Sequence, residues 1–248
     1  DSIVRKIWGN SDTILFIFGG AAAEFALNKA VDWLYFTGRL PADPIGRLFS
    51  TVTYARKIVF ATMESANATI DRMRLIHTGV ENSRGAAIPD WAYRDVLFML
   101  IHYSISAFEL LKRKLSVDEK QEVFDVFYRV GARMGLKDLP VNYQQWLIVY
   151  DQHLQNDLIR SHYTDDLFVQ YRKHLGGPRF FILKEAQKLV VPPYVRSLLG
   201  ADSPSKIAPL VPVYKLCSKL RLDGVIRTVL LPAKYKAEID ALDVEKRY

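Results

Sequence analysis

The chain has 248 residues, half of them hydrophobic, which is enough for one sizeable core and does not require a second domain. Its net charge is +7, but the 34 basic and 27 acidic residues are interspersed, and no stripe of Lys and Arg alternates with aromatic residues. This pattern argues against nucleic-acid binding. A single cysteine, Cys217, excludes an intramolecular disulfide framework and a thiolate metal cluster.

We expect one all-α domain over residues 1–248, built from about eight to eleven helices. The core is predicted over residues 14–200, and the segment 201–248, which is interrupted by prolines, is expected to be peripheral. Apolar residues recur at helical spacing along the chain, whereas no hairpin signal, internal repeat or low-complexity tract is present.

The first long helix is predicted to begin at Ser11–Asp12 and to run to about Tyr35. Charged residues interrupt its apolar sequence, so this helix is too polar to span a membrane. Gly19–Gly20 permits the close approach of another helix or of a flat ligand, and helix packing is the simpler explanation. Glu24, inside the apolar segment, needs a partner such as Arg47 or a position facing a pocket.

The stretch from Asp43 to His77 combines a strong apolar stripe with polar residues that invite a shared site. Arg47 and Thr51 lie four residues apart on one helical face, and one straight helix would separate Thr51 from His77 by about 39 Å. A break at Thr62–Ser65, where a hydroxyl can cap a new helix, would instead fold two helices back on each other. Arg47, Thr51 and His77 would then lie at one end. The stripe comprises Val52, Ala55, Val59, Met63, Ala66, Ile70, Met73 and Ile76.

Between residues 79 and 119 the sequence predicts one loop and the starts of two further helices. A polar loop is predicted over residues 79–89, and Asp90 is the expected cap of the next helix. Residues 96–105 are apolar on every side, which is typical of a helix at the centre of a molecule. Ser116 and Glu119 have the spacing of a capping box, which predicts a helix start.

Three histidines are candidate ligands. Considered by itself, His77 is best explained as an imidazole at the end of a helix, where it complements the helix dipole. His102 lies in the most apolar helix, where a histidine is more often a hydrogen-bonded core residue than a ligand. His153 precedes Asp157 by four residues, a spacing that can orient an imidazole or form a simple surface pair. Together, His77, His102 and His153 could hold zinc or non-haem iron with one position open.

Two motifs lie in the central stretch: Asp-Pro-x-x-Arg-x-x-x-Thr over residues 43–51 and Arg-x-Arg-x-x-His over residues 72–77. With them the chain resembles the MpaB-type oxygenase family, which also includes the bacterial latex-clearing, rubber-cleaving proteins. The resemblance covers about residues 14–200, and it includes Gly19-Gly20-Ala21 and the Leu139-Pro140 turn.

The resemblance implies an all-helical, globin-like fold and, in the rubber-cleaving branch, haem b held by one histidine beside an Arg-x-x-Lys-Thr segment. His77 matches the axial ligand, and Arg47 and Thr51 match the segment, in which Ser50 replaces the lysine. His102 is the second choice as iron ligand or distal base. The implied activity is the haem-dependent oxidation of an alkene or prenyl chain, with Arg47, Thr51 and His102 as catalytic candidates.

Two other function classes stay open. One is a non-haem metal hydrolase or cyclase built on the histidines, and the other is a non-catalytic helical domain that binds an apolar ligand. The expected substrate is an apolar small molecule or polymer. Because no transmembrane segment is predicted in this chain, we expect a cytoplasmic protein or one that associates peripherally with a membrane.

Overall fold

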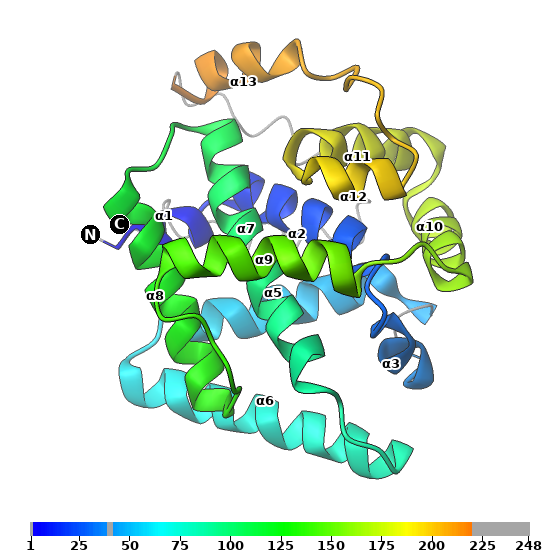
Figure 1. Ribbon diagram of the computed structural model, residues 1–248. Helices are drawn as coiled ribbons and strands as arrows, with labels where there is room; N and C mark the ends of the chain where they lie inside the picture. The colour runs from blue at the N-terminus through cyan, green and yellow to red at the C-terminus, as the bar shows by residue number, and fades with distance from the viewer. Residues whose placement is uncertain (1, 39–41, 220–248) are drawn as a thin grey trace.

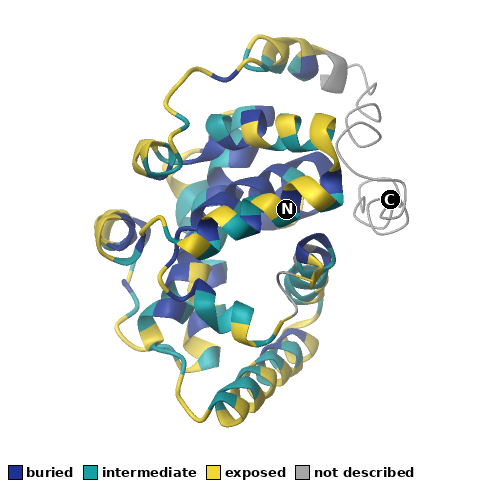
Figure 2. Ribbon diagram, turned by 90° about the vertical axis from the view of Figure 1, so that its right-hand side faces the viewer, coloured by how far each residue is buried: buried dark blue, intermediate teal, exposed yellow. Residues whose placement is uncertain are grey.

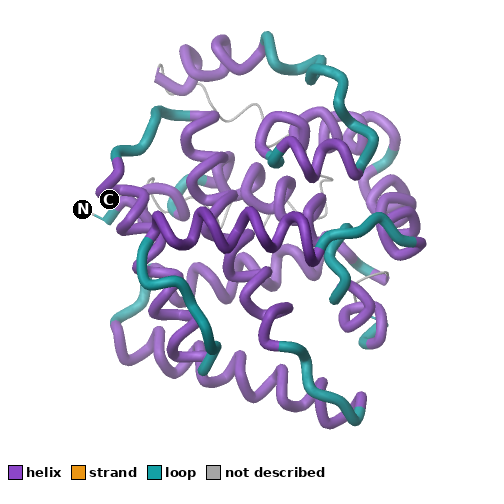
Figure 3. The backbone as a smooth tube through the Cα atoms, viewed as in Figure 1, coloured by secondary structure: helices purple, strands orange, loops and turns teal. Residues whose placement is uncertain are grey.

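The computed structural model describes residues 2–38 and 42–219, and within them the chain forms twelve helices and no strand (Figures 1 and 3). The predicted all-α class is confirmed. The count exceeds the predicted range by one, because six-residue helices such as the first and third are too short to show periodicity. The helices are α1 (Ile3–Trp8), α2 (Ser11–Phe25), α3 (Val31–Phe36), α5 (Pro44–Val59), α6 (Met63–Arg84), α7 (Asp90–Leu111), α8 (Val117–Met134), α9 (Tyr143–Asp157), α10 (His162–Leu175), α11 (Gly177–Val190), α12 (Pro193–Leu198) and α13 (Leu210–Lys219).

Helices α2 and α7 pack against each other at the centre of the molecule, and α1, α8, α9 and α11 surround them (Figure 1). The apolar run predicted to be central lies in α7, where Phe98, Ile101 and Tyr103 are buried. Val96 is exposed, with 39% of its surface accessible, and Leu100 is partly buried. Figure 2 shows the buried residues concentrated in the middle of the fold, whereas α6, at the bottom, is mostly exposed or intermediate.

At Gly20, α2 packs directly against the Tyr103 side chain of α7. A Cβ atom at Gly20 would lie 2.3 Å from the Tyr103 ring, a distance that atoms do not tolerate without a shift. At the neighbouring Gly19 a Cβ atom would lie at an ordinary 3.6 Å from the Leu183 side chain. The glycine pair therefore serves helix packing at Gly20, the simpler of the two predicted explanations.

Gly20→Ala is expected to lower the free energy of unfolding by about 1–3 kcal/mol, because the added methyl group forces Tyr103 or the helix backbone to move. Gly19→Ala is the matched control. Its methyl group has room, and alanine is favoured over glycine inside a helix by roughly 0.5–1 kcal/mol. Urea unfolding of both variants measures the difference, and equal stabilities would contradict the packing explanation.

Helix α2 differs from its predicted course at both ends. Its cap is Asn10, whose side chain accepts from the Thr13 backbone N–H, rather than Ser11–Asp12. The helix ends at Phe25 and does not continue to Tyr35. The chain after it forms backbone hydrogen bonds to the end of α9 instead, including the Asn28–Leu158 bridge. Hydrogen bonds to a distant segment thus override the local helical pattern.

The predicted break between α5 and α6 is confirmed. Helix α5 ends before Phe60, and Thr62 caps α6 by accepting from the Ser65 backbone N–H. The two helices lie side by side in Figure 1. Helix α6 then continues through most of the loop predicted over residues 79–89 and stops at Gly85, whose φ of 70° suits a helix C-terminus. That loop prediction was wrong because glycine 79 is tolerated inside an exposed helix.

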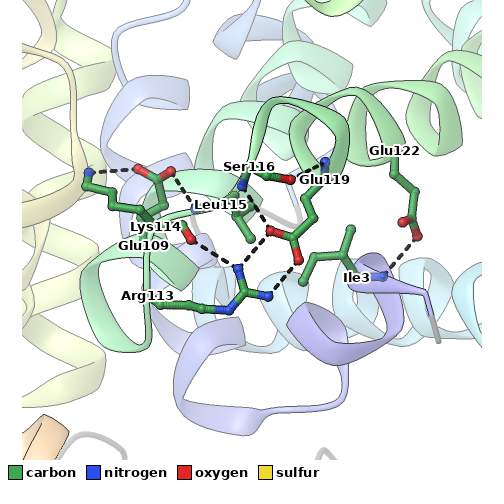
Figure 4. A network of polar contacts seen from close by, with 8 residues as sticks. All are labelled: Ile3, Glu109, Arg113, Lys114, Leu115, Ser116, Glu119 and Glu122. Carbon is green, nitrogen blue, oxygen red and sulfur yellow. Dashed lines mark hydrogen bonds and ion pairs between the residues drawn. The ribbon is translucent and has the colours of Figure 1, made fainter.

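The start of α8 has the predicted capping box. The Ser116 hydroxyl accepts from the Glu119 backbone N–H, and the Glu119 carboxylate accepts from the Ser116 backbone N–H (Figure 4). Arg113 holds both Glu119 oxygens at 2.6 and 2.7 Å. The start of α7 was misjudged by one residue: Pro89 occupies the N-cap position without a side-chain capping bond, and Asp90 lies in the first turn.

The C-terminal part lies outside the central layers. Helix α13 contacts α7, and the Tyr214 hydroxyl donates to Asp12 of α2 at 2.8 Å. Residues 220–248 of the predicted peripheral segment lie outside the described residues. Among the helices that the structure describes, none is both long and apolar enough to cross a bilayer.

Candidate functional site

The antiparallel pair α5–α6 brings the two central motifs together. Asp43 caps α5 by accepting from the Gly46 backbone N–H at 3.0 Å, so the first motif begins the helix. The short turn before α6 reverses the chain. As a result Arg47 lies near enough to His77 for its charge to lower the pKa of that imidazole.

His77 sits in the middle of α6 and is half-buried. Its ring meets the Tyr93 ring edge-on, with centroids 5.1 Å apart. Nδ1 is buried and lies near the Met73 carbonyl one turn earlier, but outside hydrogen-bond geometry. Burial lowers the pKa of His77, and Arg47 lowers it further. The imidazole is therefore neutral near pH 7, which is the state that can donate a lone pair to a metal.

The hydroxyls beside Arg47 are engaged with Arg47 itself. Ser50 Oγ donates to the Arg47 carbonyl at 2.8 Å and accepts from Arg47 Nη1 at 3.2 Å. Thr51 Oγ1 donates to the same carbonyl at 3.2 Å. Ser50 thus holds the guanidinium against its own helix, an interaction that a lysine at this position could not accept.

An apolar cavity opens beside the first turn of α5. It is small, with a volume of about 70 Å³, and Arg179 is its one charged lining residue. Pro44 and Ile45 line it from α5, only a few residues before Arg47. The cavity therefore lies at the same end of α5 as Arg47. Its lining consists of Leu15, Phe16, Phe18, Gly19, Gly20, Ala22, Pro44, Ile45, Tyr171, Leu175, Arg179, Leu183 and Ala186.

A second polar group lies in the core around Glu24, which is fully buried. The hydroxyls of Tyr103 and Tyr150 each donate to Glu24 Oε2 at 2.7 Å, and His153 Nε2 lies 3.1 Å from Oε1. The expectation that Glu24 pairs with Arg47 or faces a pocket is therefore corrected. Its partners come from α7 and α9, and they satisfy both carboxylate oxygens.

His153 extends this group towards the end of α9. It is buried rather than part of a surface pair, and Nδ1 lies 2.8 Å from Asp95 Oδ1 and 3.5 Å from Asp157 Oδ2. Burial alone would lower the pKa of His153, but Asp95 and Glu24 together raise it to about 10. Asn28 donates to the second Asp95 oxygen at 2.7 Å. Burial raises the pKa of Asp95, an effect that these contacts only partly offset.

His102 belongs to the neighbourhood of Glu24 and not to that of His77. Its ring stacks on Tyr150 at 4.9 Å, and the Val190 backbone accepts from it. Nε2 is buried and has no hydrogen-bond partner in the described part of the chain, and burial lowers the pKa of the ring.

The three histidines proposed together as metal ligands are not brought together. Within the described residues, one group of three His, Cys, Asp or Glu side chains comes within ligand distance, and it consists of Asp95, His153 and Asp157. The reason is that His77 lies on α6 at one edge of the fold, whereas His153 is on α9. Sequence reasoning missed Asp95, although a lone acid beside the apolar run of α7 was a usable signal.

A family profile described as "ER-bound oxygenase mpaB/B'/Rubber oxygenase, catalytic domain" matches residues 5–220. The chain belongs to this family. The match covers most of the chain, and it confirms the family resemblance seen in the motifs around Arg47, Thr51 and His77. No match to a curated protein or to a solved structure was found.

Membership of this oxygenase family assigns the chain to the enzymes and to oxygenase chemistry broadly. The residues of the α5–α6 pair fit a haem group on one observation of the structure: His77 is a half-buried, neutral imidazole with an unpaired ring nitrogen. Arg47 provides a positive charge close by, as an anionic propionate requires.

Proposed function

We propose that the protein is a haem b-dependent oxygenase that acts on an apolar, alkene- or prenyl-chain-like substrate. The observation that carries this proposal is the neutral imidazole of His77 beside Arg47, on a helix pair whose first turn lines an apolar cavity. The family match supplies the reaction class. The cavity supports the substrate class, because its lining is almost entirely apolar.

In this proposal His77 would hold the haem iron, and Arg47 and Thr51 would lie beside the group. When bound, haem supplies the activation of O₂, which amino-acid side chains cannot perform. Arg47 would form a charge-assisted contact to a haem propionate, and Ser50, which accepts a hydrogen bond from the guanidinium, would fix its orientation. The apolar cavity excludes water and aligns the substrate chain. His102, with its unpaired Nε2, is the alternative ligand or distal base.

The optical spectrum of freshly purified protein tests the cofactor. A Soret band and a haem content near one per chain are the expected results. Stoichiometric zinc or non-haem iron without a Soret band would overturn the haem proposal in favour of a non-haem metal enzyme. Protein with neither cofactor, purified with added haem precursor, would favour the non-catalytic ligand-binding class.

Ala22→Leu is expected to lower kcat/KM for an apolar prenyl substrate such as squalene at least about tenfold. The larger side chain fills part of the cavity that Ala22 lines and misplaces the substrate. Ala21→Leu is the matched control, because the neighbouring Ala21 is not among the cavity-lining residues. Oxygen uptake measures turnover, and the Soret band verifies that haem content is unchanged. Equal losses in both variants would argue against this cavity as the substrate site.

A further inference from the structure

Three side chains of types that bind metal ions lie close together where α9 crosses α7 (Figure 1). They are Asp95, His153 and Asp157. His153 Nδ1 lies 2.8 Å from Asp95 Oδ1 and 3.5 Å from Asp157 Oδ2. The three ligand atoms all lie within 4.8 Å of one another. Asp95 projects from α7, and the other two residues are one turn apart on α9, so the group spans two helices.

His153 Nδ1, at the centre of this group, forms ion pairs with the two carboxylates. His153 is only 3% exposed, and Nδ1 has no hydrogen-bond partner of acceptable geometry although two carboxylates face it. In an ordinary imidazole–carboxylate pair the N–H points along the line to one oxygen. Here Nδ1 lies within 3.5 Å of acids from two helices without such alignment to either. A buried nitrogen placed in this way points to a ligand between the three side chains.

The surroundings match the outer shell of a metal site. A metal-bound histidine almost always donates its other ring N–H to a carboxylate, a backbone carbonyl or a water molecule. His153 Nε2 lies 3.1 Å from Glu24 Oε1, and Tyr103 and Tyr150 fix that carboxylate through its other oxygen. Metal-binding carboxylates are themselves hydrogen-bonded, and Asp95 Oδ2 accepts from Asn28 at 2.7 Å.

The donor set and the access route define the type of ion. One imidazole nitrogen and two carboxylate oxygens suit first-row divalent metals such as Zn²⁺, Mn²⁺ or Fe²⁺. Donors about 2.1 Å from such an ion lie roughly 3.4 Å apart in tetrahedral geometry, within the range of the separations seen here. The Asp157 side chain is 26% exposed, which leaves an opening to solvent.

We propose that Asp95, His153 and Asp157 bind one divalent first-row transition-metal ion, separately from the haem group. Glu24 orients His153 from the outer shell, and a fourth position faces solvent beside Asp157. The ion takes the place of the Nδ1 proton and joins α7 to α9. No residue of this site belongs to the Arg47, Thr51 and His77 group.

Calorimetric titration of the full chain with ZnCl₂, after EDTA treatment and desalting, tests the proposal. One ion per chain is expected, together with a raised melting temperature. Asp157→Asn should bind Zn²⁺ at least about tenfold more weakly, because it removes a charged ligand. Asp151→Asn is the matched control. It removes the same charge from an exposed position of the same helix and should bind like the wild type.

Cobalt(II) provides a second measurement that needs no variant. A low-coordinate site with an imidazole ligand gives visible bands far stronger than those of hydrated cobalt. A wild-type chain that binds no Zn²⁺, a hydrated-type Co²⁺ spectrum, or equal binding by Asp157→Asn and Asp151→Asn would each overturn the site. These measurements use neither the Soret band nor turnover, so their outcome is separate from that of the haem proposal.

Discussion

His77→Ala is expected to give soluble, folded protein that retains almost no haem. In the proposed site the imidazole would supply the bond to iron, which alanine cannot replace. Loss of the side chain does not open a core cavity, because His77 is only half-buried on α6. The ratio of Soret absorbance to protein concentration measures the loss, and circular dichroism verifies the fold.

Two further variants serve as controls for this result. His102→Ala should keep haem while losing activity or some core stability, since its ring stacks on Tyr150. Arg47→Ala should keep the fold and weaken haem retention or turnover, because it removes a charge-assisted contact. Haem lost from the His102 variant and kept in the His77 variant would move the axial role to His102. His77 would then be an ordinary helix residue.

Glu24→Ala is expected to lower the free energy of unfolding by about 3–5 kcal/mol, the largest stability loss in this set. The substitution removes a buried carboxylate and leaves two tyrosine hydroxyls and the charged His153 without their acceptor. Urea unfolding in the presence of EDTA measures the loss without a contribution from bound metal.

The matched control for this variant is Glu64→Ala, which removes an exposed glutamate from the first turn of α6. Glu64→Ala should change the free energy of unfolding by no more than about 1 kcal/mol, which is the contribution of a helix-dipole contact. Similar losses in the two variants would show that the network around Glu24 adds no stability. The stability loss of Tyr150→Phe should lie between the losses of these two variants. It deletes one hydrogen bond to Glu24 and leaves the pair between Glu24 and His153 intact.

Features set by neighbouring residues could be predicted from the sequence. The capping box of Ser116 and Glu119 needs only the residues it contains, and the break at Thr62 follows from one hydroxyl and the first turn after it. The proximity of Arg47 and His77 then follows, because a tight turn fixes how two helices run past each other. These are short-range consequences of propensity and capping.

Features set by distant residues could not be predicted in this way. Glu24 was recognisable as a buried acid that needs a partner, but Tyr103, Tyr150 and His153 follow it by 79, 126 and 129 residues. Many polar residues of the chain would have met the same need. The end of α2 was missed for the same reason, because the hydrogen bonds that stop the helix come from α9.

The link between the chain after α2 and the end of α9 has a consequence for biosynthesis. The Lys29 backbone N–H donates to the Asp157 carbonyl, and the Ile159 N–H donates to the Leu27 carbonyl. On the ribosome, α2 emerges long before these partners exist, and contacts of such wide sequence separation form slowly. Until residue 159 has left the exit tunnel, the nascent N-terminal half cannot complete these contacts and exposes apolar surface, which is the kind of surface that chaperones bind.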